Sequence, residues 1–379
     1  MRRQHLYILL LGVSLSCGNN PGKRIGQPTP MANPVKYAKG FLTGKTDTST
    51  VVEIFNPWQG ALGVQLSYQL IPRKNFKELT TDSCITIPVP LRRVVCMSTS
   101  YLAYIEALNG SEGIVGISGT GYVYSEKINS LIGNGKILDV GYDQGLNYER
   151  IAQLKPDVVL CYGVGSESIS YLSKLKEMGI RLMFIGDYLE SDPLGKAEWI
   201  KVFGCLLGQE QRADSIFTAV EHGYRTNQCL ASGITEKPTV FLNLPYRDVW
   251  YFPGGNNYLS KLISDAGGNY IFSHLTGSVS YPVSFEKSLE GALNSDIWIN
   301  TGTAMSLNDI EEFDSRLVNV PPFKNSRVFN NNQRLSPGGG NDFWESGALR
   351  PDLILHDLMA ILHPEMVKDS NLYYYRKLR

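Results

Sequence analysis

The chain has 379 residues, with 36 basic and 36 acidic side chains and 43% hydrophobic residues. This composition is typical of a globular protein long enough for two domains. A net charge of zero argues against nucleic acid as a partner, because proteins that bind it usually carry a basic excess. Histidine occurs 5 times, which argues against a site built from several imidazole ligands.

The N-terminus has the pattern of an export signal. Arg2 and Arg3 precede an apolar stretch that is too short to span a bilayer comfortably, and the stretch ends at Ser16-Cys17. A small residue followed by cysteine resembles a lipobox, so we expect residues 1–17 to be a lipoprotein signal with Cys17 as the lipid-bearing residue. Ser14 stands where leucine is usual, and a plain secretory signal is the alternative. No later stretch is long and apolar enough to span a membrane.

The first half of the chain predicts an α/β lobe. Residues 18–48 are rich in Gly, Asn and Pro in their first part and read as a flexible tether. Residues 49–90 contain short β-like runs, which predict a small addition of strands. From Arg92 onward strand-like and helix-like runs alternate, which indicates a parallel sheet covered by helices on both faces. We therefore expect an N-terminal lobe over residues 49–190.

The second half repeats this alternation after a long helical stretch. Residues 191–228 predict a linking helix, because apolar side chains recur there at helical spacing, and Gly208 is a candidate end for a first helix. Strand-like and helix-like runs then alternate again, so residues 229–379 are expected to form a C-terminal lobe. The predicted fold is α/β, with two Rossmann-like lobes of mainly parallel sheets joined by a long helix.

One stretch of the sequence recurs in each half. "NYERIAQLKPDVVLCYG" at 147–163 and "VSFEKSLEGALNSDIWINTG" at 283–302 each predict a helix followed by a buried strand. Both contain an acid followed by a base, an aspartate at the start of the strand, and a glycine six residues after that aspartate. One such pair is weak evidence for a repeat, but its occurrence once in each expected lobe strengthens it.

The acids of this repeat, Glu149 and Glu286, lie in the first turns of their predicted helices. Asn147 and Ser284 are good N-caps. The helix dipole favours an anion in the first turn by roughly 0.3–1 kcal/mol. Capping is therefore sufficient to explain both acids, and their recurrence at matching places leaves a second role open.

From Arg92 to Leu362 the chain resembles the substrate-binding proteins of ABC importers for iron chelates and vitamin B12, which have two lobes joined by a rigid helix. The resemblance rests on "GLNYERIAQLKPDVVLCYG", "DPLGKAEWIKVFGCLLG", "YLSKLISDAGGNYIF" and "YPVSFEKSLEGALNSDIWINTG". The first and last are specific in combination, whereas each alone is ordinary. Such proteins are often tethered at a membrane, which agrees with a lipid on Cys17. Residues 49–90 have no counterpart in the smallest members.

The resemblance implies a binding protein rather than an enzyme. It would be exported, lipid-anchored in the cell envelope and facing the periplasm. It would capture an iron chelate (siderophore or haem) or cobalamin in the cleft between the lobes and deliver it to a permease and ATPase complex. No catalytic residue, resident cofactor or protein-held metal is implied.

In this family one glutamate on each lobe docks against arginines of the permease. Residues 147–151 match an N-x-E-R-I stretch of the vitamin B12-binding member, which places Glu149 at the first docking position. The stretch "YPVSFE" has Tyr281 where that member has tryptophan and is one residue shorter, yet it places Glu286 at the second position. Two exposed carboxylates at a fixed separation can match the spacing of two arginine patches.

Aromatic residues gather in the loops that are predicted to follow strand ends, where ligands of α/β proteins bind. We expect the chelate to contact residues of this set, together with one arginine: Tyr122, Tyr124, Tyr142, Tyr162, Arg247, Trp250, Tyr251, Tyr281, Phe343 and Trp344. By the resemblance, Tyr162, Tyr281 and Trp344 align with aromatic positions of the vitamin B12-binding member. Any one of these residues could equally be a packing residue. Arg334 and Arg350 are further candidates for acidic groups of a chelate, or pair with nearby acids.

Three other readings stay open. A solute-binding protein for free metal ions would need converging imidazoles, which few histidines can supply. An exported enzyme on a two-lobed scaffold would need a catalytic motif, and the sequence has no G-x-S-x-G elbow, P-loop or G-x-G-x-x-G after a strand. A purely structural lipoprotein would leave the repeat unexplained.

Overall fold

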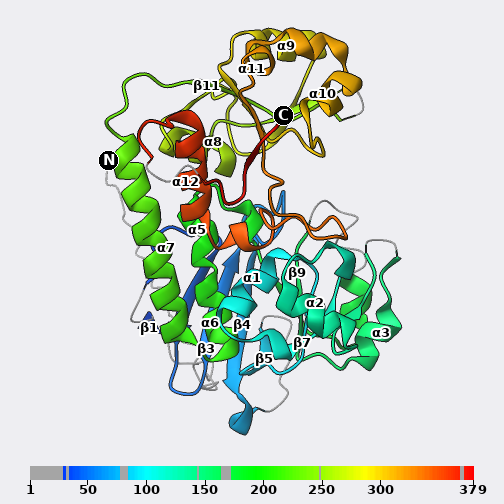
Figure 1. Cartoon of the computed structure of the whole chain (residues 1–379). Coiled ribbons are helices and arrows are strands. Elements are labelled where there is room, and N and C mark those ends of the chain that lie inside the picture. Colours follow the sequence, from blue (N-terminus) through cyan, green and yellow to red (C-terminus); the bar gives the residue numbers. More distant parts are fainter. Residues whose placement is uncertain are drawn as a thin grey trace, which may run out of the picture.

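The computed structural model describes residues 29–30, 34–76, 84–142, 145–163, 172–246, 249–367 and 371–379. Two lobes, each built on a mostly parallel sheet, are connected by consecutive helices, and a third sheet precedes them (Figure 1). The predicted α/β fold class with two lobes is confirmed.

The N-terminal lobe, or N-lobe, is built on a parallel sheet with the strand order β10-β9-β6-β7-β8. All residues of β6, β7 and β9 are buried, as expected for strands covered on both faces. The strands are β6 (Val94–Cys96), β7 (Ile114–Ile117), β8 (Leu138–Asp139), β9 (Val158–Cys161) and β10 (Leu182–Phe184). Its labelled helices are α1 (Ser100–Ala107), α2 (Glu126–Gly133) and α3 (Tyr148–Gln153).

The C-terminal lobe, or C-lobe, has the strand order β13-β11-β15-β16-β17, in which only β17 is antiparallel. Its strands are β11 (Thr239–Leu242), β13 (Asn269–Tyr270), β15 (Ile297–Ile299), β16 (Val328–Asn330) and β17 (Arg376–Lys377). A separate antiparallel pair consists of β12 (Trp250–Pro253) and β14 (Ser280–Val283). The helices are α8 (Tyr258–Asp265), α9 (Phe285–Leu293), α10 (Leu307–Phe313), α11 (Pro321–Lys324) and α12 (Pro351–Leu362).

The two lobes share a strand order, β10-β9-β6-β7 in one and β16-β15-β11-β13 in the other. The aspartate of the sequence repeat has the same role in both. Asp157 Oδ2 accepts hydrogen bonds from Arg92 N at 2.8 Å and Arg93 N at 3.0 Å, beside the start of β6. Asp296 Oδ2 accepts one from Thr239 N at 2.7 Å, at the start of β11. Each aspartate thus ties the start of one strand to its neighbour.

The expected helix caps are also confirmed. Asn147 Oδ1 accepts a hydrogen bond from Arg150 N at 2.8 Å, at the start of α3. Ser284 Oγ accepts one from Lys287 N at 3.4 Å, at the start of α9. Each side chain satisfies an amide that the helix itself cannot bond.

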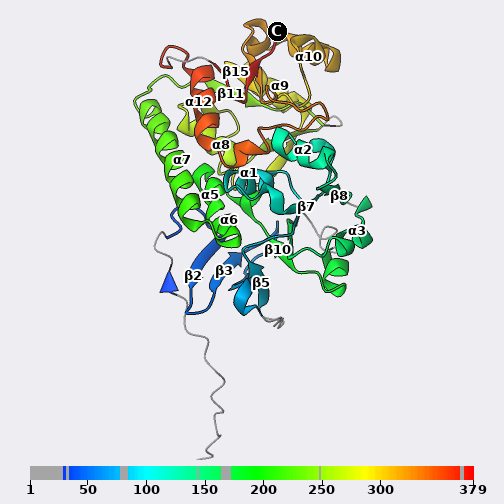
Figure 2. The same cartoon turned by 60° about the horizontal axis from the view of Figure 1, so that its bottom comes forward.

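The lobes are linked by three helices, α5 (Pro193–Glu198), α6 (Ile200–Leu207) and α7 (Glu210–Ala231). Gly208 ends α6 with a φ of 66°, as its position predicted, because glycine adopts the left-handed conformation without a steric cost. Helix α7 packs against α6 and α12 and extends along one side of both lobes (Figures 1 and 2). Among the described residues, no helix has the length and apolarity needed to cross a membrane.

The third sheet comes from the N-terminal part of the chain, with the order β1-β2-β3-β4-β5. Its strands are β1 (Thr29–Pro30), β2 (Phe41–Lys45), β3 (Thr50–Phe55), β4 (Gln65–Pro72) and β5 (Ile85–Val89). The expected tether to residue 48 is therefore too long, because β2 lies within it. Tyr68 of β4 joins this sheet to the N-lobe, since its buried hydroxyl oxygen accepts a hydrogen bond from Phe184 N at 3.1 Å.

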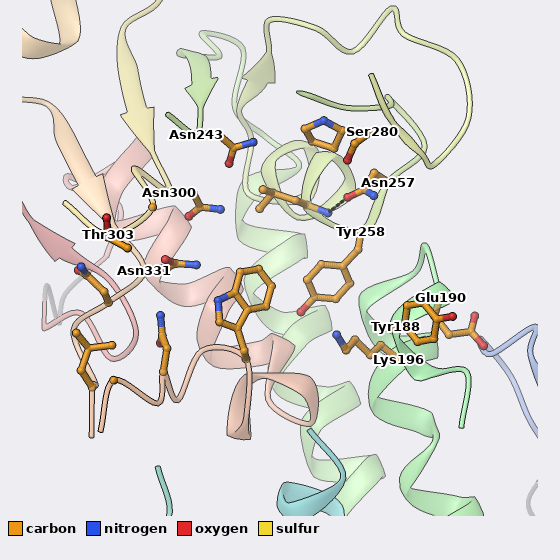
Figure 3. A pocket seen from close by; sticks show the side chains of 18 of the residues that line it. Tyr188, Glu190, Lys196, Asn243, Asn257, Tyr258, Ser280, Asn300, Thr303 and Asn331 are labelled. Carbon is orange, nitrogen blue, oxygen red and sulfur yellow. Dashed lines mark hydrogen bonds between the residues drawn. The ribbon is translucent and has the colours of Figure 1, made fainter. Parts of the chain in front are cut away.

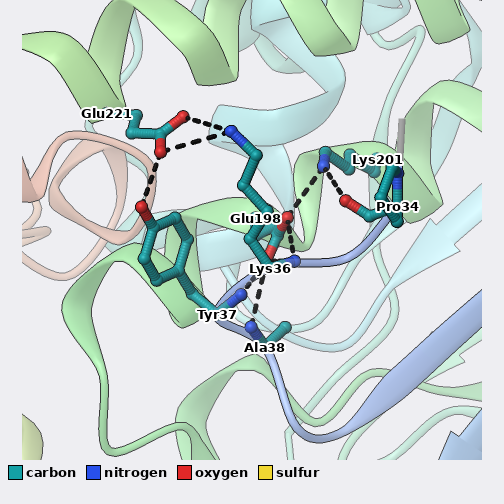
Figure 4. Close-up of polar contacts among 7 residues, drawn as sticks. All are labelled: Pro34, Lys36, Tyr37, Ala38, Glu198, Lys201 and Glu221. Carbon is teal, nitrogen blue, oxygen red and sulfur yellow. Dashed lines mark hydrogen bonds and ion pairs between the residues drawn. The ribbon is translucent and has the colours of Figure 1, made fainter. Parts of the chain in front are cut away.

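A buried carboxylate fastens the segment before β2 to the linking helices (Figure 4). Glu198 is 0% exposed and accepts hydrogen bonds from the backbone amides of Lys36, Tyr37 and Ala38, the shortest at 2.7 Å. Lys201 Nζ lies 2.7 Å from Glu198 Oε1 and balances its charge. A buried ion pair needs such additional hydrogen bonds to offset the loss of water.

We expect Glu198→Ala to lower the free energy of unfolding by about 3–5 kcal/mol, the cost of leaving a buried partner charge and its donors unpaired. Glu221→Ala is the matched control, because Glu221 also contacts this segment but pairs with the exposed Lys36 ammonium at 3.1 Å. Its loss should cost less, about 1–2 kcal/mol, because the Lys36 ammonium is exposed and the Tyr37 hydroxyl alone loses a partly buried acceptor. Urea unfolding measures both variants. Equal losses would show that Glu198 does not fasten this segment.

Candidate functional site

A cleft of about 830 Å³ lies at the carboxyl ends of the C-lobe strands and faces the linking region (Figure 3). Asn243, Asn300 and Asn331 each follow the last residue of a strand, β11, β15 and β16, and line it. The opposite wall comes from α5 and the turn before it, through Tyr188, Glu190 and Lys196. Ligands of α/β proteins commonly bind at such strand ends.

The backbone explains why asparagine ends two of these strands. Asn243 and Asn300 have φ angles of 64° and 60°, a left-handed conformation that asparagine tolerates better than most side chains. The chain can therefore turn sharply at the sheet edge and leave a polar side chain at the cleft. The Asn243 amide is partly used, since its Nδ2 donates to Tyr251 O at 2.8 Å.

Two further asparagines have unused hydrogen-bonding groups. Asn331 is 5% exposed, its side chain makes no hydrogen bond with a described residue, and its amide nitrogen points into the cleft (Figure 3). Asn332 donates to Ala304 O at 3.0 Å, whereas its Oδ1 is buried and has no partner among the described residues. Buried polar atoms without partners are rare in folded proteins and require an explanation.

Two charged side chains line the cleft. Glu190 is occupied within the protein: its carboxylate accepts hydrogen bonds from Gly40 N at 2.8 Å, Lys39 N at 3.0 Å and Trp199 Nε1 at 3.1 Å. Burial raises the pKa of Glu190, although these bonds oppose the rise. Burial lowers the pKa of Lys196, and the charge of Asp187 opposes this change.

Aromatic side chains also line the cleft. Trp344 is 56% exposed there, and Tyr258 and Tyr188 contribute from the far side. Among the described residues that were predicted to contact the ligand, Trp344 is the one that lines the cleft. Tyr162 comes near, with its ring centroid 6.3 Å from that of Tyr188.

Two predicted contacts are core residues and need correction. Trp250 is 0% exposed, stacks on Phe252, and donates from Nε1 to Leu242 O at 3.0 Å. Phe343 is 3% exposed and packs edge-on against Trp344 and two tyrosines of the C-terminal segment. Both rings are covered by neighbouring side chains, so neither offers a face to the cleft.

Other described residues of the predicted set lie outside the cleft lining. Tyr122, Tyr142 and Tyr251 are exposed elsewhere. The Tyr281 hydroxyl donates to Thr276 O. Arg247 lies outside the described residues.

The remaining tyrosine of the set, Tyr124, belongs to a contact between distant parts of the chain. Its backbone amide and that of Ser125 donate to Glu345, at 2.8 Å and 2.9 Å. Burial raises the pKa of Glu345 to about 7, against the effect of these two bonds. Arg334 stacks on the Tyr124 ring and pairs with Asp342 at 2.6 Å.

Arg350 is likewise paired, with Asp352 at 2.8 Å. Both additional arginine candidates therefore have acidic partners within the protein. The cation in the described lining of the cleft is Lys196. The sequence analysis predicted neither this lysine nor the asparagines as ligand contacts. The asparagines had a visible signal, since each follows an apolar strand-like run. Lys196 had none, because it is one of two lysines in a helical stretch.

The two proposed docking acids are exposed and belong to different lobes. Glu149 is in the first turn of α3 and Glu286 in the first turn of α9. Neither has an ion pair with a described residue. Both carboxylates are thus available to an external partner.

Within the described residues, no three side chains of His, Cys, Asp or Glu lie close enough together to hold a metal ion. The chemistry available in the cleft is therefore hydrogen bonding, one ammonium charge and aromatic contact. These groups can bind and orient a ligand.

Comparison with known proteins agrees with this architecture. Residues 94–335 match the family described as periplasmic binding protein. An uncharacterized lipoprotein of Methanocaldococcus jannaschii is 30% identical over 368 residues, covering 90% of this chain and 85% of its own length. An uncharacterized ABC transporter substrate-binding lipoprotein of Bacillus subtilis is 25% identical over 48% of this chain and 55% of its own.

Solved structures show the same fold. The periplasmic heme-binding protein of Roseiflexus sp. RS-1, in its apo form, superposes with a TM-score of 0.57 at 20% identity. The match covers 73% of this chain and 99% of that protein. With more than half of its residues matched and two lobes of the expected topology, the chain belongs to the periplasmic binding protein family.

Proposed function

We propose that this protein is the substrate-binding component of an ABC importer, held at the membrane by a lipid on Cys17. It captures an organic metal chelate and delivers it to a permease and ATPase complex. The observation that carries the proposal is the cleft, which joins the C-lobe strand ends to the linking region in a member of this family. The lipoprotein description of its relatives supports the anchor.

Size and lining favour a chelate as the cargo. A volume of about 830 Å³ is near the upper part of the range of small-molecule sites, roughly 300–1,000 Å³. Trp344 and two tyrosines supply aromatic faces for a large organic ligand. A related fold is described as heme-binding. Iron–siderophore, haem and cobalamin are the candidate cargoes. In the described part of the chain, no observation favours the free-metal or enzyme alternatives.

The first test is titration of the purified soluble form, lacking the signal, with ferric siderophores, haemin and cyanocobalamin. We expect at least one to bind with a Kd of about 1 μM or tighter and to quench tryptophan fluorescence. Trp344→Phe should lose a larger share of the quenching than Trp58→Phe, because Trp344 lines the cleft and Trp58 does not. Failure of all three classes to bind would contradict the proposed function.

The second test concerns Glu149 and Glu286. The double variant Glu149→Ala/Glu286→Ala should abolish chelate uptake in cells while leaving chelate affinity unchanged, because both acids are exposed and outside the cleft. Glu126→Ala/Glu290→Ala is the matched control, with one exposed acid removed from each lobe. A parallel loss of affinity and uptake, or an equal effect of the control pair, would rule out docking through these acids.

A further inference from the structure

The Lys196 ammonium is a charged group of the cleft that is available to a ligand. Lys196 forms no ion pair with a described residue, and its Nζ lies 5.2 Å from the centre of the Tyr258 ring. Figure 3 shows its ammonium group directed toward the cavity below Tyr258. Asp187 acts on the Lys196 charge, but it is buried behind the wall with its own hydrogen bond from Tyr104. A partly desolvated ammonium strongly favours a bound anion.

Opposite Lys196, the C-lobe presents hydrogen-bond donors. The side-chain nitrogens of Asn300 and Asn331 both point into the cleft (Figure 3). Asn331 is at least nine-tenths buried, and its amide has no partner among the described residues. An amide held in this way is available to a ligand oxygen or nitrogen that displaces water from the cleft.

The one carboxylate of the lining cannot serve as a metal ligand without losing its own contacts. Glu190 is 5% exposed and is bonded to two backbone amides and the Trp199 indole. The other described lining residues include no histidine or cysteine. A metal that enters this cleft therefore meets no free carboxylate, imidazole or thiolate in the described lining, and the tyrosine hydroxyls and the Met305 thioether remain as possible ligands.

We propose that the cleft selects an anionic, oxygen-rich chelate. Lys196 contacts an anionic oxygen of the chelate. On the other side of the chelate, the side-chain amides of Asn331 and Asn300 donate hydrogen bonds to carbonyl, carboxylate or hydroxyl oxygens. This inference rests on the proposed function and narrows it to one charge class. It disfavours a cationic chelate, which would meet the unpaired ammonium.

The test uses the purified soluble chain and four probes that differ in charge and coordination: ferric citrate, a ferric tris-catecholate, cationic ferrioxamine B and cyanocobalamin. We expect an anionic ferric probe to bind at least tenfold more tightly than ferrioxamine B or cyanocobalamin, a difference on the order of one charge-assisted contact.

Variants then locate the charge. Lys196→Met should weaken binding of the anionic probe roughly 10- to 100-fold, and Asn331→Leu somewhat less, whereas Lys196→Arg should retain most of the affinity. Lys136→Met is the control, because Lys136 is exposed and pairs with Glu112 far from the cleft. Thermal melting checks that each variant folds, and the probe ranking of the unaltered protein does not depend on any variant.

The outcomes separate the two proposals. If a neutral or cationic probe binds as tightly as the anionic ones, or if folded Lys196→Met binds as well as Lys136→Met, the charge-class inference is overturned and the proposed function stands. If no chelate binds at all, both fail.

Discussion

The architecture depends on the carboxylates that hold the N-terminal segment against the linking helices. Glu198 has no contact with solvent and is satisfied by three backbone amides and the Lys201 ammonium. Removing water from a carboxylate is costly, so this arrangement is stable only when every donor is in place. It fixes helix α5, which carries Lys196 two residues earlier and directs it to the cleft. The same constraint continues through Glu190, which binds Lys39 and Gly40 and also forms part of the cleft wall.

The two sides of the cleft have different origins and different chemistry. The C-lobe side consists of asparagines at the ends of β11, β15 and β16, where the chain turns at a sheet edge. The opposite side consists of the Lys196 ammonium and the Tyr188 ring, carried by α5 and the turn before it, and Tyr258 at the start of the C-lobe helix α8 lies next to Lys196. A ligand that contacts both sides is recognised by hydrogen-bond donors and by the ammonium charge at the same time. This is the combination that favours oxygen-rich anions over other cargoes of similar size.

The sequence predicted features set by local patterns more reliably than features set by distant contacts. The alternating runs, the caps at Asn147 and Ser284, and the end of α6 at Gly208 depend on neighbours along the chain, and the structure confirms them. Strand β2 was missed because its five residues include a glycine, a threonine and a lysine, and its burial comes from pairing with β3. Trp250 was misplaced because its loop-like surroundings form a second small sheet over the C-lobe core.

The charged residues were the hardest part of the site to predict. An arginine after a strand can meet a ligand or a nearby acid, and only the tertiary structure shows that Arg334 and Arg350 have acidic partners. Lys196 is the opposite case, because no described carboxylate lies within ion-pair distance of its ammonium group, which is therefore available to a ligand.

The most direct test of this account is a crystal structure of the protein with a bound anionic ferric chelate. The account predicts the chelate in this cleft, with an anionic oxygen at Lys196 and an oxygen at Asn331. A chelate bound elsewhere, or one that leaves Lys196 without a contact, would contradict it.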